Sequence, residues 1–326
     1  MKRVSERIAR ASMNALASTS TRGLTSKRAL GGDAERAPTY GERDAFFVGV
    51  SDKGRGAYAA RGIDRGEVIL RDQNPLACHR TLANARTRCG RCLRETADGA
   101  FCVECEANAE REFAAFERQF VDMSAIEAYC ERRGGLKFPL LCARVAAKIL
   151  SGSLDEQTLE WLCYASNVGD RATMPPQWIE ESIALASAFA GADAGLITPE
   201  WYAGVTTRLH LNAFRVEIPP ALTASASTSA WRRAMSSSLD AIARGRASGT
   251  AIYVLPSLFN HSCEPNVAAT WESSDARLTA RALVDIPPGH ELAIAYVDVD
   301  VDVHARARAL EPYGFACACA RCVVAA

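Results

Sequence analysis

Phe259-Asn-His-Ser-Cys-Glu-Pro-Asn266 is the most specific motif of this 326-residue chain. The seven positions from 260 to 266 contain Asn, His, Ser, Cys, Pro and a second Asn, directly after an apolar segment. A protein core does not bury so many polar groups without giving each a hydrogen-bond partner. We therefore expect an irregular segment with a functional role, which follows a buried strand.

A second informative segment closes the sequence, Cys317-Ala-Cys319-Ala-Arg-Cys322. Three thiolates are one fewer than a structural zinc site uses, so a distant cysteine has to supply the fourth ligand. Three of the remaining cysteines lie in apolar, helical surroundings, where cysteine usually behaves as a small buried side chain: Cys130, Cys142 and Cys163. These surroundings leave Cys78 and Cys263 open as the fourth ligand, and spacing alone does not select between them.

Four more cysteines form two C-x2-C pairs, Cys89-Gly-Arg-Cys92 and Cys102-Val-Glu-Cys105, separated by nine residues. Each pair can turn two thiolates toward one ion, and two pairs complete the tetrahedral sulfur shell that zinc prefers. The spacing predicts a zinc knuckle. Disulfides or free thiols are the alternative, which we disfavour because we expect no secretory leader.

The distribution of charged side chains along the sequence indicates which kinds of binding partner are favoured. The 38 basic and 38 acidic side chains cancel, but residues 1–32 hold seven basic side chains and one acid, which leaves the remainder acidic. An acidic body is the wrong sign for general binding to nucleic-acid phosphates and suits a cationic partner. No stretch reaches the roughly 18 apolar residues of a spanning helix. We expect neither membrane insertion nor direct nucleic-acid binding.

The basic N-terminal segment is also rich in Ser and Thr, and Arg3, Arg7 and Arg10 fall on one helical face. This composition is typical of an organelle transit peptide. A solvated, disordered tail is the alternative.

Hydrophobic periodicity predicts an α+β protein. Strands are expected at residues 45–50, 67–71, 213–218, 251–255, 278–283 and 291–296. Between 104 and about 210, apolar residues recur at three and four, which predicts helices. Glycine-containing turns are expected at 51–57 and 62–66, and a variable loop around a short helix at 219–249.

Four motifs in this order resemble the SET-domain protein lysine methyltransferases: Lys53-Gly-Arg-Gly56, the stretch 259–266, Ala293-Ile-Ala-Tyr296 and Tyr313-Gly-Phe-Ala-Cys-Ala-Cys-Ala-Arg-Cys322. The resemblance covers about residues 45–75 and 205–322. It is strongest to the SMYD-type and plant trithorax-related groups, whose SET sequence is also split by cysteine pairs. Unlike a full MYND finger, this sequence has no further Cys or His directly after Cys105, so we expect one zinc ion in that module.

The resemblance implies an α+β SET domain with small sheets of the β-clip type and a pseudoknot-like C-terminal segment, interrupted by the zinc knuckle and a helical insertion. The expected parts are a transit peptide or disordered leader at 1–40, the N-terminal SET part at 41–88, the four-cysteine zinc knuckle at 89–105, the helical insertion at 106–210, the C-terminal SET part at 211–300 and a post-SET cysteine segment at 301–326.

The resemblance also implies a cofactor, S-adenosylmethionine, and two structural zinc sites. The residues it places against S-adenosylmethionine are Lys53, Gly54, Arg55 and Gly56 as a loop, Asn212 near the methionine part, Ser257, Asn260 and His261 largely through backbone groups, and Phe315 stacked on adenine. It implies Cys263 as the ligand that joins Cys317, Cys319 and Cys322 around zinc.

The implied reaction is direct methyl transfer to the ε-amine of a lysine. An ammonium has no lone pair, and burial lowers a lysine pKa toward the neutral form. Tyr296, at the end of an apolar strand, is our choice for aligning the reacting atoms, and Tyr313 for lining the lysine channel. The other histidines are expected on the surface or in packing roles.

The predicted function is an S-adenosylmethionine-dependent lysine methyltransferase acting on a lysine-containing protein, by resemblance a histone tail in the nucleus. One alternative is a SET-shaped zinc module that does not catalyse, such as a chromatin scaffold. Another is a methyltransferase of an organellar protein, in the mitochondrion or plastid, if the basic leader directs import. A nucleic-acid-binding zinc protein is a third, which the acidic body disfavours.

Overall fold

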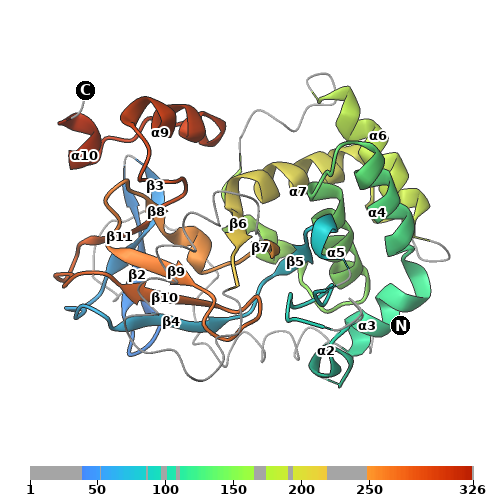
Figure 1. Ribbon diagram of the computed structural model, residues 1–326, viewed down its shortest axis with the longest axis horizontal. Helices are drawn as coiled ribbons and strands as arrows, with labels where there is room; N and C mark the ends of the chain where they lie inside the picture. The colour runs from blue at the N-terminus through green and yellow to red at the C-terminus, as the bar shows by residue number, and fades with distance from the viewer. Residues whose placement is uncertain are drawn as a thin grey trace, which may run out of the picture. The chain divides into compact units, whose positions relative to one another are not determined.

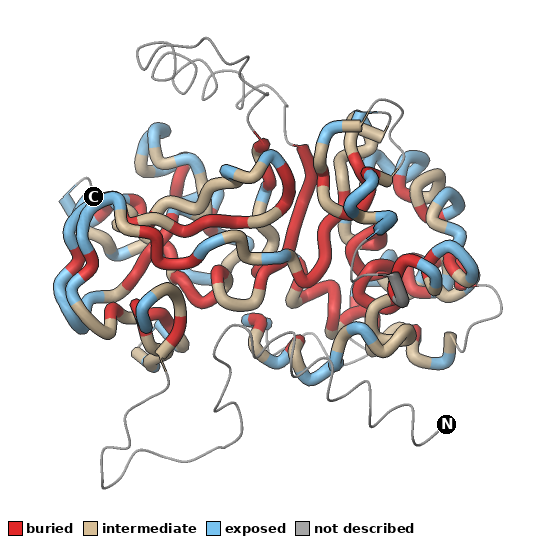
Figure 2. The backbone as a smooth tube through the Cα atoms, turned by 90° about the horizontal axis from the view of Figure 1, so that it is seen from below, coloured by how far each residue is buried: buried red, intermediate tan, exposed pale blue. Residues whose placement is uncertain are grey.

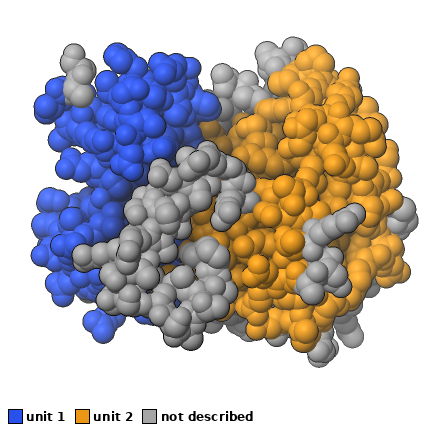
Figure 3. All heavy atoms as spheres, viewed as in Figure 1, with its two compact units in different colours: residues 1–73, 255–270, 278–326 blue, residues 74–254, 271–277 orange. Residues whose placement is uncertain are grey.

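A computed structural model describes residues 39–51, 53–85, 87–96, 101–107, 111–164, 174–189, 194–218 and 248–324. The chain forms two compact units (Figure 3). Unit 1 combines residues 1–73, 255–270 and 278–326, and unit 2 combines residues 74–254 and 271–277. Residues 1–38 of the expected leader and most of the expected loop at 219–249 lie outside the described residues.

Unit 1 contains a five-stranded sheet in the order β1-β2-β3-β11-β8 (Figure 1). The strands are β1 (Thr39–Tyr40), β2 (Phe46–Ser51), β3 (Gly54–Ala59), β11 (Glu291–Ile294) and β8 (Asn260–His261). All neighbours are antiparallel except β8 and β11, which run parallel, with Asn260 opposite Ala293 and His261 opposite Ile294. The parallel pair brings the segment after Asn260 beside the segment after Ala293.

A second sheet of unit 1 has the order β4-β10-β9, with β4 (Val68–Gln73), β10 (Leu278–Ala282) and β9 (Val267–Thr270). A 3-10 turn at Pro256–Leu258 precedes β8. The chain then ends in α9 (Val303–Leu310), a 3-10 turn at Glu311–Tyr313 and α10 (Ala320–Val323). The carboxylate of Asp302 accepts the N–H of Ala305 and so caps α9, as expected for an N-cap aspartate.

Unit 2 contains a three-stranded sheet, β5 (Ala77–Arg80), β7 (Gly249–Ile252) and β6 (Ala213–Val216), in that order. Its helices are α2 (Val103–Ala107), α3 (Arg111–Phe120), α4 (Met123–Arg132), α5 (Phe138–Leu150), α6 (Pro176–Ser187) and α7 (Pro199–Asn212), with 3-10 turns at Leu82–Asn84, Glu156–Trp161 and Ala194–Leu196.

Helix α5 is the centre of unit 2, because every residue from Pro139 to Ala147 is buried. A helix that is buried all round has to pack against several neighbours. Contacts with α3, α4, α6, α7 and β5 meet that requirement. Buried backbone runs through the strands and helices of both units (Figure 2).

The α+β prediction is confirmed, and the predicted strands and helical middle are present with ends shifted by a few residues. The expected turn at 51–57 is wrong, because Gly54–Ala59 is strand β3. Ser51 pairs with Gly54 across a tight hairpin, and Gly54 has a φ of 90°, which glycine adopts without strain. Among the described helices, none has the length and apolar character that crossing a bilayer demands.

Candidate active site and metal centres

In unit 1, the C-terminal tail brings its cysteines to the segment that follows β8. The sulfur atoms of Cys263, Cys317, Cys319 and Cys322 all lie within 4.8 Å of one another. The Sγ atom of Cys263 is 3.9 Å from that of Cys317 and 3.5 Å from that of Cys322. Four sulfurs at these separations fit a tetrahedral zinc ion, which would hold the tail against β8.

This geometry decides between the two candidates for the fourth ligand. Cys263 is the one that joins the tail cysteines. In unit 2, the thiol of Cys78 instead donates to the carbonyl oxygen of Arg91 at 2.6 Å. Of the cysteines expected to be buried, Cys130 and Cys142 are buried, but Cys163 is exposed, so that expectation was wrong for Cys163. It follows the 3-10 turn that ends at Trp161 rather than continuing a buried helix.

Positive charge lies beside the sulfur cluster of unit 1. The buried guanidinium of Arg306 has Nη2 3.7 Å from the Sγ of Cys322, and Arg321 Nη1 donates to the carbonyl oxygen of Cys263 at 3.4 Å. Four thiolates around a divalent ion carry a net charge of −2, which such groups offset. Burial opposes ionisation, but the N–H of Cys322 and neighbouring thiols lower the pKa of Cys319 to about 7.

The predicted knuckle in unit 2 is a second cluster. The sulfur atoms of Cys89, Cys92, Cys102 and Cys105 also lie within 4.8 Å of one another. The Sγ of Cys89 accepts the backbone N–H groups of Arg91 at 3.4 Å and Cys102 at 3.5 Å, which stabilises a thiolate. Two four-cysteine clusters that can bind zinc are therefore present among the described residues.

Three aromatic residues predicted for the site lie together in unit 1. Tyr296 follows β11, Tyr313 ends a 3-10 turn, and Phe315 follows two residues later. The ring centroid of Tyr296 is 5.1 Å from that of Tyr313 and 6.4 Å from that of Phe315. Burial raises the pKa of Tyr313, so its hydroxyl stays protonated. Phe315 is 41% exposed and keeps part of its ring accessible for stacking.

The segment 259–266 holds Tyr296 by its hydroxyl group and by its backbone N–H. Its hydroxyl donates to the carbonyl oxygen of Phe259 at 2.8 Å, and its backbone N–H donates to Nδ1 of His261 at 3.0 Å. The other ring nitrogen of His261, Nε2, is 3.3 Å from the Sγ of Cys263. Burial, with the nearby charge of Arg306, lowers the pKa of His261 to about 4, so the imidazole is neutral at pH 7.

The glycine-containing segment at 53–56 is tied to β11 and β8. Lys53 Nζ forms an ion pair with Glu291 Oε2 at 2.6 Å. Asn260 Nδ2 donates to Glu291 Oε1 at 2.8 Å and to the carbonyl oxygen of Arg55 at 3.2 Å. A Cβ atom on Gly56 would lie 2.7 Å from Asn260 Nδ2, so a larger residue would have to displace that amide. Sequence reasoning did not find Glu291, because a single acid at the start of a strand is an ordinary surface residue.

The remaining two predicted cofactor residues are Asn212 and Ser257. Asn212 ends α7 in unit 2, where its Nδ2 donates to the carbonyl oxygens of Cys163 at 2.8 Å and Arg208 at 2.7 Å, and its Oδ1 accepts the N–H of Cys163. Its amide therefore holds the end of α7 to residue 163. Ser257 is in the 3-10 turn before Phe259 in unit 1. The cofactor roles of Asn212 and Ser257 stay predictions.

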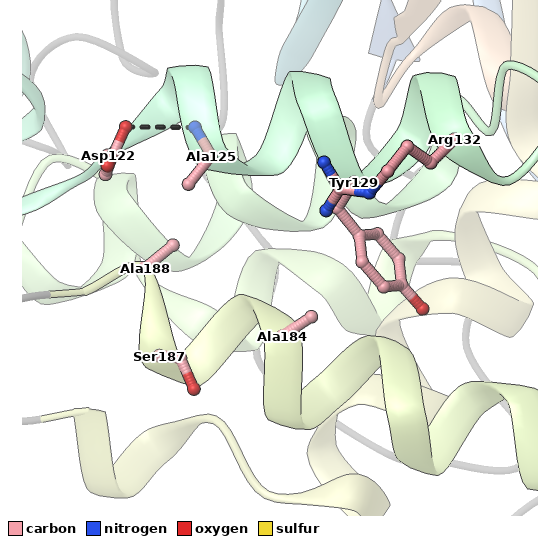
Figure 4. A pocket seen from close by; sticks show the side chains of 7 residues that line it. All are labelled: Asp122, Ala125, Tyr129, Arg132, Ala184, Ser187 and Ala188. Carbon is pink, nitrogen blue, oxygen red and sulfur yellow. Dashed lines mark hydrogen bonds between the residues drawn. The ribbon is translucent and has the colours of Figure 1, made fainter.

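Unit 2 has a groove between α4 and α6 that contains none of the predicted site residues (Figure 4). Its lining residues are Asp122, Ala125, Tyr129, Arg132, Ala184, Ser187 and Ala188. The carboxylate of Asp122 accepts the N–H of Ala125 and caps α4. The groove carries no cluster of catalytic groups, and we assign it no role.

Comparison with known proteins identifies the family. The SET domain family matches residues 54–297. Histone-lysine N-methyltransferase ATXR4 of Arabidopsis thaliana is 30% identical over 293 residues, which cover 84% of this chain and 85% of that protein. Protein-lysine N-trimethyltransferase SMYD5 of Homo sapiens is 38% identical over 82 residues, 24% of this chain and 20% of that protein.

Among solved structures, the SET domain of LSMT bound to lysine and AdoHcy aligns with 79% of this chain and 51% of its own. The sequence identity is 13% and the TM-score is 0.34, a likeness too weak to support a conclusion. The family match and the similarity to ATXR4 are sufficient. The chain therefore belongs to the SET domain family, as a protein-lysine N-methyltransferase.

Proposed function

We propose that this enzyme uses S-adenosylmethionine to methylate a lysine in a histone tail. The single observation that carries the proposal is the cluster of Tyr296, Tyr313 and Phe315 beside the four-cysteine centre of unit 1. Membership in the SET domain family supports the reaction class, and similarity to the histone-lysine N-methyltransferase of Arabidopsis supports the histone substrate. The acidic charge of the chain after residue 32 suits a cationic tail.

The residues of unit 1 fit S-adenosylmethionine. Gly54 leaves backbone open, because a Cβ there would meet no atom within 4 Å, and Phe315 offers a partly exposed ring to adenine. Lys53, Arg55, Asn260 and His261 complete the expected contacts, with Asn212 and Ser257 as further predictions. The cofactor, when bound, supplies a methyl group on a positively charged sulfur.

Two tyrosine side chains orient the substrate lysine amine and favour its neutral form. The hydroxyl of Tyr296 donates its proton to the carbonyl oxygen of Phe259, so toward a lysine the Tyr296 oxygen acts as an acceptor. An oxygen in this state can accept a hydrogen bond from the lysine amine and orient its lone pair. The rings of Tyr296 and Tyr313 are apolar walls that favour the neutral amine over the ammonium.

Tyr296→Phe tests this role. The variant keeps the ring but loses the oxygen that orients the amine, so we expect methylation of histone peptides to fall by about 100-fold, in the range for a lost orienting group. Tyr58→Phe is the matched control, because Tyr58 is on β3 and its ring stacks on Phe47. Methylation is measured by mass spectrometry of the peptide, and folding by circular dichroism. Equal activity in the two variants would remove Tyr296 from the mechanism.

Calorimetry separates an enzyme from a SET-shaped scaffold. An enzyme binds S-adenosylmethionine with measurable heat, whereas a scaffold that does not catalyse has no need of it. Peptide arrays that contain histone tails and organellar lysine sequences then separate the two substrate classes. Preference for the organellar peptides would overturn the histone proposal and leave the methyltransferase activity intact.

We also propose a nuclear location, which follows from a histone substrate. The basic segment at 1–32 gives the competing expectation of import into a mitochondrion or plastid. A fluorescent fusion, with mass spectrometry of the mature N-terminus, tests the two. Cleavage near residue 30 together with organellar fluorescence would displace the nuclear proposal.

A further inference from the structure

We infer that His261 is a positioning residue that transmits the location of the metal-ligand sulfur of Cys263 to Tyr296. The inference rests on the proposed function, because it concerns the group that orients the lysine. Its basis is a continuous path of hydrogen bonds within unit 1: from the Sγ of Cys263 to Nε2 of His261 at 3.3 Å, and from Nδ1 of His261 to the backbone N–H of Tyr296 at 3.0 Å.

The path fixes the tautomer of His261. A backbone N–H can only donate, so Nδ1 has to present its lone pair to Tyr296. With Nδ1 occupied as an acceptor, the N–H of the ring is on Nε2, which lies 3.3 Å from the Sγ of Cys263. A thiolate that binds a metal ion is a good acceptor for this N–H, and such outer hydrogen bonds orient the ligand.

The same short segment holds Tyr296 a second time. The Tyr296 hydroxyl donates to the carbonyl oxygen of Phe259, two residues before His261. Since β8 and β11 run parallel, with His261 opposite Ile294, Cys263 and Tyr296 leave the same ends of neighbouring strands. A displacement of Cys263 therefore reaches Tyr296 through the imidazole, while the Phe259 contact fixes how far the phenol can turn.

This arrangement gives the sulfur cluster a role beyond holding the tail. The ring of His261 also lies 5.4 Å from the ring of Tyr296 and 6.0 Å from the ring of Phe315, measured between centroids. One side chain thus lies beside an expected metal ligand, the residue proposed to orient the amine and the ring expected to stack on the cofactor. We expect its loss to lower the turnover number rather than peptide affinity.

The first test measures the tautomer in the full-length wild-type protein. With ¹⁵N-labelled histidine and the metal sites filled with zinc, long-range ¹H–¹⁵N spectra report which ring nitrogen is protonated. We expect His261 to carry its proton on Nε2, and ¹¹³Cd substitution to show a coupling between this proton and the metal across the sulfur. A proton on Nδ1, or on both nitrogens, would overturn the inference whether or not the protein methylates any peptide.

The second test is His261→Asn. The asparagine carbonyl can replace Nδ1 as the acceptor for Tyr296, but no atom reaches Cys263. We expect the kcat for peptide methylation to fall about 10–100-fold, as for other lost outer-shell partners, with little change in the KM for the peptide. The ¹¹³Cd resonance of this cluster should shift, while the knuckle resonance stays in place.

His290→Asn is the matched control, because His290 is an exposed residue of the turn before β11. It should change neither kcat nor the ¹¹³Cd spectrum. A His261→Asn protein that binds the metal and retains the wild-type kcat would refute the positioning role. If the variant does not fold, the wild-type tautomer and ¹¹³Cd coupling still decide. If wild-type protein methylates no peptide but shows the expected tautomer and coupling, the proposed function fails and the hydrogen-bond path stands.

Discussion

Gly56 and Asn260 illustrate how little room unit 1 leaves around the segment at 53–56. Asn260 uses both hydrogens of its amide, one for the carbonyl oxygen of Arg55 and one for Glu291. This amide lies where a side chain on Gly56 would have to go. The requirement for glycine here is a matter of space, and it follows from a side chain that is more than two hundred positions away in the sequence.

Gly56→Ala should therefore displace the Asn260 amide. We expect a loss of about 1–3 kcal/mol in the free energy of unfolding, the usual cost of overpacking, together with weaker binding of S-adenosylmethionine. Gly62→Ala is the control, since a Cβ there meets no atom within 4 Å. Urea unfolding and calorimetry measure the two effects. Equal behaviour of the two variants would contradict the steric argument.

At this scale, the sequence allowed prediction of most residues that the structure brings together in unit 1. Specific motifs made it possible to predict the four sulfur ligands, Tyr296, Tyr313 and Phe315. Glu291 and Arg306 were not predicted, since their importance comes from a partner in another part of the chain and neither has a distinctive neighbourhood. Asn212 was predicted from family likeness, and its side-chain amide is hydrogen-bonded within unit 2.

Between elements, the strongest feature of unit 2 is a buried ion network that joins the knuckle to two helices. Arg91, within the first C-x2-C pair, has Nη2 3.4 Å from Glu117 Oε1 on α3, and Arg144 on α5 has Nη1 2.8 Å from Glu117 Oε2. The guanidinium carbon of Arg91 also lies 3.6 Å from the ring centre of Phe101. One carboxylate thus compensates two buried guanidinium groups.

Glu117→Gln should remove the carboxylate that lies closest to both guanidinium groups, which leaves Arg91 with the more distant Glu106, whose Oε1 is 4.0 Å from Arg91 Nη1. Removing one partner of a buried pair costs about 3–5 kcal/mol, and we expect a loss of this size in the unfolding free energy. Glu180→Gln is the control, because Glu180 pairs with Arg133 on the surface, where an ion pair contributes at most about 1 kcal/mol. Denaturant unfolding compares the two. Losses of similar size would show that the network contributes no more than a surface pair.

The contact of β5 with α4 should make unit 2 sensitive to acid. Burial lowers the pKa of His79 below its usual 6.5, and Glu127, which lies 3.4 Å from His79 Nε2, has a lowered pKa because of that histidine. In both cases the unfolded chain takes up the proton first as the pH falls. The stability is therefore complete above pH 6.5 and decreases below it, first through His79 and below about pH 4.5 through Glu127 as well.

His79→Asn tests this window. The asparagine amide can keep the hydrogen bond that Nδ1 donates to the carbonyl oxygen of Arg80, but it does not titrate. We expect the decrease in melting temperature between pH 6.5 and 4.5 to be smaller than in the wild type. The exposed His304→Asn should behave like the wild type. An unchanged decrease in His79→Asn would assign the acid sensitivity to other groups.

The elements were predictable where periodicity is strong, as in the buried helix α5 and the strands β2 and β10. Short strands such as β8 and β1 were not, because two residues carry no period. Strand β3 was read as a turn since its first residues are Gly-Arg-Gly. Pairing with β2 and β11 on both sides supplies the hydrogen bonds that outweigh the poor strand propensity of glycine.

At the scale of the whole molecule, each compact unit contains one cluster of four cysteines. Cys263→Ser should reduce the zinc content from two ions per chain to one and lower the thermal stability of unit 1, because structural zinc contributes directly to folding. Cys163→Ser, at an exposed cysteine outside both clusters, is the control. Metal analysis by mass spectrometry gives the count. Two ions retained in Cys263→Ser would exclude that cysteine as a ligand.

The way unit 1 is threaded has a consequence for how the protein is made. Strand β4 pairs with β10, where Asp72 and Thr279 are 207 residues apart, and three of the four sulfurs of its cluster belong to the tail. Almost the entire polypeptide has to be translated before these strands can pair and these cysteines can come together. Most of unit 2 is translated earlier and can begin to fold. Until β10 has been synthesised, β4 has no pairing partner in this sheet and should need a chaperone. A chain that ends just before Cys317 lacks three of the four cysteines and should be degraded.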